Sequence, residues 1–195
     1  MTRKYILSAV VLCVLLVAGC HTAPKLPDVS RIPMNVTIRR FDRAFASLDT
    51  TRIQQSLSEL DNAYPDFLPV YLENVMNFGA YPDSSAGYGA EISAFINGRD
   101  VRLLNDTVAA HFSDMSATEK GLQDGFRYIK YYFPDFRPPV VVTFISGLAN
   151  YGAITVGPVL GIGLDMFLGE DFVPYTKVAD PYPDYMLHQF APPFI

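Results

Sequence analysis

Apolar residues recur along the chain at two different spacings, and the spacing changes near residue 139. Between residues 49 and 133 they recur every three or four positions, as on the buried face of a helix. The pattern predicts a turn-rich loop at residues 79–89 and helices over residues 53–64, 67–76, 91–96, 101–112 and 116–133. We expect Asp49 or Thr50 to cap the first helix and a capping box at residues 116–119 to begin the last.

Beyond residue 139 the apolar residues form short runs. Residues 140–145 (VVVTFI) are β-branched and aromatic and are bounded by turn residues, which is typical of a buried strand. Two shorter runs, 153–156 and 159–164, predict a hairpin. Residues 35–40 alternate between apolar and polar side chains, as in an edge strand. Together these elements predict an α+β fold, a single domain over residues 35–195 with its helical N-terminal half packed on a small mixed or antiparallel sheet.

Two polar residues stand where this sheet should be apolar, Ser146 at a strand end and Asp165 directly after the run 159–164. A buried carboxylate destabilises a fold unless it is hydrogen-bonded or paired with a cation. We therefore expect Asp165 either to cap the turn at residues 166–169 or to bind a ligand or a metal. Ser146, Asp165, and Asn150 and Tyr151 of the glycine-rich hairpin are the candidate ligand-binding residues.

The first residues form a unit of their own. Residues 1–19 combine a basic start with an apolar run too short to span a bilayer, which is typical of a signal peptide. The sequence LVAGC at residues 16–20 resembles the lipobox of bacterial lipoproteins, so we expect Cys20 to carry lipid such as palmitate and residues 20–34 to form a tether. An acylated Cys20 would hold the chain at a membrane. By analogy with lipoprotein sorting, His21 at the next position favours the outer membrane, facing the periplasm.

Charge and composition exclude several kinds of function. The formal net charge is −5, so a basic surface for nucleic acid is not expected. Both cysteines lie within the signal peptide and lipobox, and the three histidines are far apart in sequence, which leaves no local zinc motif. Ser146 lacks the Gly-x-Ser-x-Gly elbow of serine hydrolases. We therefore expect no enzymatic activity, metal or cofactor, and we expect Arg40 and Asp42 to form a surface pair or to bracket a turn.

Three segments in order carry a resemblance to a known family: FPDFRPPVVVTFISG at residues 133–147, NYG at 150–152 and GIGLDMFLGED at 161–171. The series resembles the GldB family of gliding-motility lipoproteins. The resemblance implies a non-catalytic component of gliding motility and its associated secretion machinery, with partners among the proteins of that machinery.

The GldB family is itself similar, distantly, to predicted zinc peptidases. This implies a zincin-like fold without the metal motif and, as an alternative function, a degenerate peptidase-like domain that binds a peptide or a small ligand. In the family the proline-rich C-terminal region leads into further helices. The resemblance therefore implies that the domain is incomplete at its C-terminus.

Overall fold

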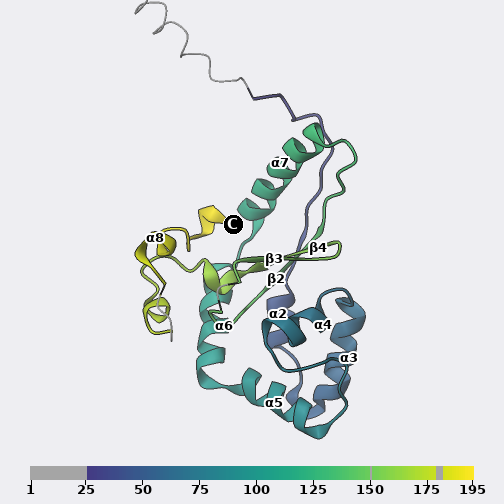
Figure 1. Ribbon diagram of the computed structural model, residues 1–195, viewed down its shortest axis with the longest axis vertical. Coiled ribbons are helices and arrows are strands. Elements are labelled where there is room, and N and C mark those ends of the chain that lie inside the picture. Colours follow the sequence, from purple (N-terminus) through teal and green to yellow (C-terminus); the bar gives the residue numbers. More distant parts are fainter. Residues whose placement is uncertain (1–25, 150, 179–181) are drawn as a thin grey trace, which may run out of the picture.

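The computed structural model describes residues 26–149, 151–178 and 182–195, in which helices pack against both faces of a central sheet (Figure 1). The fold is α+β, as predicted, with a largely helical N-terminal half. The α5 helix begins within the predicted loop at residues 79–89, which is therefore shorter than expected. The helices are α2 (Phe41–Ala46), α3 (Ile53–Ala63), α4 (Leu68–Val70), α5 (Ala86–Asn97), α6 (Arg99–His111), α7 (Ser116–Tyr132) and α8 (Asp184–Leu187), with short 3-10 and π-helical turns between some of them.

The sheet is mixed, with strand order β1-β2-β4-β3. Two strands, β1 (Ile38–Arg39) and β4 (Val159–Gly163), pair in parallel with the central strand β2 (Val140–Phe144), whereas β3 (Ala153–Val156) is antiparallel to β4. The predicted strands at 140–145, 153–156 and 159–164 are confirmed to within one residue at each end. Because β2 and β4 run in the same direction, the polar residues that follow each strand are brought to the same edge of the sheet.

Side chains of β2 alternate between two hydrophobic cores, one on each face of the sheet. Val142 and Phe144 belong to the first core, which also contains the aromatic cluster Phe41, Phe67 and Tyr71. Val141 and Ile145 belong to the second core, together with residues of α7 and of the C-terminal segment. A strand buried on both faces is mostly apolar, which explains the nearly continuous apolar run in the sequence.

Arg40 is partly buried and Asp42 is buried, so the first of the two roles predicted for them, a surface pair, is wrong. The Arg40 guanidinium donates to both carboxylate oxygens of Asp42, at 2.9 and 2.7 Å, and to the main-chain carbonyl of Phe112 at the end of α6. The Thr143 hydroxyl of β2 donates to the same carboxylate. Because a buried carboxylate needs a cation or hydrogen-bond donors, this pair joins α2, α6 and β2.

Helix capping was predicted correctly in one place and wrongly in another. Asp49 caps the helical turn that begins at residue 50, as expected. The capping box at residues 116–119 is wrong, because Ser116 already lies within α7 and donates its N–H to Asp114. The Glu119 carboxylate instead accepts from the N–H of Ile38, at 2.8 Å. It thus satisfies a donor on the open side of an edge strand.

Two glycines of β4 allow neighbouring segments to approach closely. A Cβ at Gly161 would lie 2.9 Å from side-chain atoms of Ile154 and Phe67. A Cβ at Gly163 would lie 1.9 Å from the main-chain oxygen of Tyr151, where the chain enters β3. Side chains can move aside more easily than backbone, so glycine is required most strictly at position 163.

We expect Gly163→Ala to lower the free energy of unfolding by about 3 kcal/mol, because the β3–β4 pairing must open to admit the methyl group. The matched control is Gly125→Ala in α7, where a Cβ would meet open space. There the change should raise the free energy of unfolding by about 0.5–1 kcal/mol, since glycine is a poor helix former. Urea denaturation followed by circular dichroism measures both effects, and an unchanged midpoint for Gly163→Ala would contradict the close approach.

Candidate functional site

The turn that follows β2, at residues 146–149, is held by a carboxylate from beyond β4. Asp165 lies in the short 3-10 turn Leu164–Met166 and has no exposed surface. Its Oδ1 accepts from the N–H of Ser146 at 2.9 Å, and its Oδ2 accepts from the N–H of Leu148 at 2.7 Å and from the Ser146 hydroxyl at 3.0 Å. One side chain therefore joins the neighbouring ends of two parallel strands.

Two tyrosines complete the hydrogen bonding of the same turn. Tyr71 donates to the main-chain carbonyl of Ile145 at 3.0 Å, and Tyr182 donates to that of Leu148 at 2.7 Å. Burial, with smaller contributions from two nearby aspartates, raises the pKa of Tyr71 well above its ordinary value. Its hydroxyl therefore keeps its proton and remains a hydrogen-bond donor at neutral pH.

The backbone of the turn has an unusual conformation at two successive residues. Gly147 has φ = 70° and Leu148 has φ = 65°. Glycine adopts this left-handed conformation freely, whereas a leucine there costs on the order of 1–2 kcal/mol. Asp165 and Tyr182 bind the N–H and the carbonyl of Leu148, so hydrogen bonds on both sides hold it in place. Strained backbone of this kind is often found at binding sites.

The environment of Asp165 favours its neutral form. Burial raises the pKa of this carboxyl above its ordinary value, and the hydrogen bonds from Leu148 and Ser146 offset part of the rise. Among the described residues, no Lys, Arg or His side chain forms an ion pair with it. The Tyr175 hydroxyl donates to its main-chain carbonyl at 2.7 Å, which fixes the turn on which the carboxyl stands.

A groove of about 570 Å³ lies beside the turn, between α6 and residues 172–178. Most of its wall is apolar, with Leu104 on α6, Leu148 on the turn and Phe172 among its lining residues. Two charged residues, Asp100 and Lys177, also line it. The volume and the mostly apolar lining are typical of sites that bind a small molecule or a short peptide.

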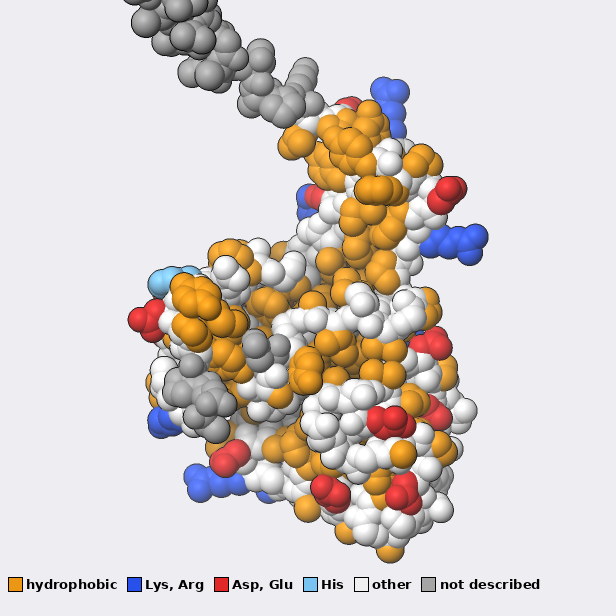
Figure 2. Space-filling model, in the orientation of Figure 1, with side chains coloured by type: hydrophobic (Ala, Val, Ile, Leu, Met, Phe, Trp, Pro, Cys, Tyr) orange, Lys and Arg blue, Asp and Glu red, His pale blue; other side chains and the backbone are white. Residues whose placement is uncertain are grey.

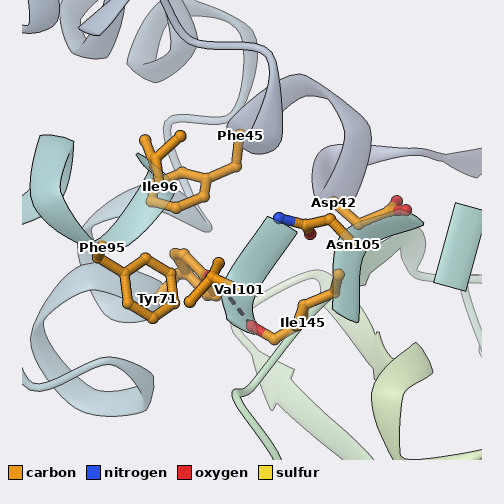
Figure 3. A pocket seen from close by; sticks show the side chains of 8 residues that line it. All are labelled: Asp42, Phe45, Tyr71, Phe95, Ile96, Val101, Asn105 and Ile145. Atoms are coloured by element: carbon orange, nitrogen blue, oxygen red, sulfur yellow. Dashed lines mark hydrogen bonds between the residues drawn. The ribbon is translucent and has the colours of Figure 1, made fainter. Parts of the chain in front are cut away.

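A second cavity near the turn is much smaller, about 10 Å³ (Figure 3). Asp42 and Asn105 line it, together with Tyr71, Ile145 and other apolar residues. It has room for about one water molecule, so it does not suit an organic ligand. The larger groove is therefore the candidate binding site.

Of the three candidate residues that the structure describes, it brings two together. Ser146 and Asp165 are in direct contact, but the Asp165 side chain caps the turn at residues 146–148 and not the turn at 166–169, so that prediction is wrong. Tyr151 lies at the surface and lines neither cavity described above, and Asn150 lies outside the described residues. Within the described ranges, no three His, Cys, Asp or Glu side chains cluster in a way that could hold a metal ion.

Sequence reasoning missed the residues that line the groove. They come from residues 95–107, 147–148 and 172–178, which the fold brings together from distant parts of the chain. No local pattern marks them. The one available signal was the buried position expected for Asp165, which implied a partner without identifying it.

We expect Asp165→Asn to lower the free energy of unfolding by about 2–4 kcal/mol, because the amide nitrogen would replace an oxygen that accepts from a main-chain N–H. The raised pKa gives this effect a definite pH dependence. The folded state binds the proton more tightly than the unfolded state, so the contribution of Asp165 is greatest below the unfolded pKa of 3.8 and falls as the pH rises through the folded pKa. Urea midpoints at several pH values should therefore show the difference between wild type and variant shrinking above pH 3.8.

Asp49→Asn is the matched control, because its pH dependence has the opposite sign. Hydrogen bonds from Thr51 and Arg52 lower the pKa of Asp49 to about 2. The contribution of Asp49 is therefore present at neutral pH and is lost as the pH falls from 3.8 through about 2. If the effects of the two variants changed with pH in the same direction, burial would not be what sets the pKa of Asp165.

Comparison with known proteins assigns the chain to a family. None of the curated proteins and none of the solved structures with which the chain was compared matches it. The model of one family, described as gliding motility protein GldB, matches residues 22–195, nearly the whole chain. The chain therefore belongs to the GldB family of gliding motility proteins.

Proposed function

We propose that this protein is a lipid-anchored, non-catalytic component of gliding motility that acts by binding proteins of the gliding and secretion machinery. Lipid on Cys20 attaches it to the outer membrane, facing the periplasm. The observation that carries this proposal is the family match, which begins at residue 22, two residues after the cysteine that ends the LVAGC sequence. A domain that starts just after such a cysteine has the arrangement expected of a lipoprotein.

No helix in the described ranges is long and apolar enough to cross a bilayer. One feature of the structure supports the non-catalytic role. The Ser146 hydroxyl donates to Asp165 and accepts from the N–H of Ala149 at 3.2 Å, so its hydrogen bonds are used within the fold. This bonding supports a structural role for Ser146 rather than that of a nucleophile.

The groove supports a second candidate function, that of a degenerate peptidase-like domain that binds a peptide or a small ligand. The specific observation is the strained Leu148, whose backbone is held on both sides and which lines the groove. The apolar wall would take an aliphatic or aromatic side chain, and Asp100 and Lys177 would interact with charged groups beside it. The two functions are compatible, because the occupant could be a segment of a partner protein.

Cys20→Ala tests the anchor. In a strain that lacks the gene, the variant should incorporate no radiolabelled palmitate, leave the membrane fraction and fail to restore colony spreading, because the acyl chains provide the membrane affinity. Cys13→Ala is the matched control, since that cysteine lies inside the signal peptide and its loss should leave labelling and spreading intact. Labelling of the Cys20→Ala protein, or of neither protein, would overturn the anchor.

Leu103→Glu tests the groove. Leu103 lines it and is exposed, so a charge there should block an apolar occupant while changing the free energy of unfolding by less than about 0.5 kcal/mol. We expect loss of colony spreading with normal labelling and normal abundance of the protein. The control is Ala90→Glu, an exposed position on α5 away from the groove, which should spread normally. Normal spreading of both variants would show that gliding does not need the groove.

A further inference from the structure

The segment before β1 runs along α7 in the opposite direction to the helix. Three hydrogen bonds fix this arrangement, from the Ile38 N–H to Glu119, from Gln123 to the carbonyl of Val36, and from Arg127 to the carbonyl of Ile32, at 2.8, 3.4 and 3.1 Å. Residues earlier in the segment therefore lie nearer the C-terminal end of α7. Figure 1 shows the segment leaving the body beside that end of the helix, which projects from the sheet.

Large apolar side chains are exposed to solvent at this projecting end. We call Leu26, Tyr131, Tyr132 and Phe133 the aromatic tip; their exposed fractions are 71, 50, 60 and 67%. Figure 2 shows hydrophobic side chains covering much of the projecting part. Scattered exposed apolar residues are common, but a contiguous group on a projection usually marks a contact surface.

The position of the aromatic tip relative to Cys20 indicates what that surface contacts. Leu26 is six positions after Cys20, a stretch that spans at most about 22 Å when fully extended. Lipid on Cys20 would therefore keep the aromatic tip within this distance of the membrane surface. Tyrosine and phenylalanine are well suited to this boundary, because their rings bury in the headgroup region while the tyrosine hydroxyl stays hydrated.

The charges near the aromatic tip in sequence leave a net charge of only +2. Lys25, Arg31, Lys130 and Arg137 lie near it in sequence, as do Asp28 and Asp135, and Lys130 already donates to the carbonyl of Phe136 at 2.8 Å. A contact that depended on anionic lipids would need a clear excess of basic residues. The chemistry therefore favours shallow insertion of rings into the interface over electrostatic adsorption.

We propose that the aromatic tip inserts into the membrane surface beside the lipid anchor, as a second point of attachment that fixes how the domain stands on the membrane. This inference rests on the proposed lipidation of Cys20. A second contact beside the acylated Cys20 strengthens attachment and restricts rotation of the domain about the tether.

The absence of tryptophan from the chain allows a direct test. In the full lipidated protein, Phe133→Trp places one fluorophore in the aromatic tip, and Leu103→Trp places one on α6, at a residue that is 55% exposed. Each protein is reconstituted in zwitterionic phosphatidylcholine vesicles with and without brominated acyl chains, which quench tryptophan only on contact. We expect a blue shift and severalfold stronger quenching for Phe133→Trp than for Leu103→Trp, with little change between low and high salt.

The other possible results would overturn either the insertion of the aromatic tip or the lipid anchor. Unquenched emission from Phe133→Trp in protein that carries palmitate would overturn the inference and leave the anchor intact. A blue shift without quenching would also overturn it, because the surface would then be covered by protein, either a second copy or another part of the same chain. Absence of palmitate from both proteins would refute the anchor itself.

A second variant separates insertion from simple proximity. Replacing Tyr131, Tyr132 and Phe133 together by serine changes only exposed side chains, so the fold should be retained by circular dichroism. We expect a palmitate-labelled protein of this kind to leave vesicles faster than wild type in transfer to acceptor vesicles. Equal transfer rates would show that the aromatic tip adds nothing to the anchor.

Discussion

The fold depends on how one buried carboxylate is satisfied. Asp165 follows β4 and has no contact with solvent, and its oxygens are bound by donors of the turn that follows β2. Without those donors, burying the carboxyl would strongly destabilise the fold. The turn must therefore form together with the burial of Asp165. This requirement fixes the ends of the two parallel strands relative to each other. It also places Leu148, and with it one wall of the groove.

A second buried carboxylate at the same edge of the sheet is satisfied in a different way. Asp42 is paired with the Arg40 guanidinium, whereas Asp165 is bound only by N–H and O–H donors. Burial, with smaller contributions from these two aspartates, raises the pKa of Tyr71, which lies close to both. A tyrosine that keeps its proton donates reliably to the carbonyl of Ile145, between the two sites. The aspartates thus reinforce the structure of the turn from two sides.

Sequence reasoning found the elements that depend on local patterns and missed those that depend on pairing. The β-branched run at 140–145 and the glycine-separated runs after it predicted the strands, because strand residues are chosen for their β-branched or apolar side chains within a short stretch of sequence. The parallel pairing of β2 with β4 is not visible in the sequence, because either strand of the β3–β4 hairpin could have paired with β2. For this reason the partner of Asp165 could not be predicted. Glu119 was misread because its position fits a capping box, while its actual partner, the N–H of Ile38, is distant in sequence.

The two proposed binding surfaces, the aromatic tip and the groove, lie in different parts of the molecule. The aromatic tip lies at the end of α7 where the chain leaves toward Cys20, whereas the groove lies between α6 and residues 172–178, nearer the opposite end (Figure 1). With the aromatic tip in the membrane, α7 would act as a short support that raises the sheet and turns the groove away from the lipid. A flexible tether alone would leave the groove free to face any direction, including the bilayer. Two-point attachment would restrict those directions and so raise the effective concentration of the groove for a partner in the periplasm.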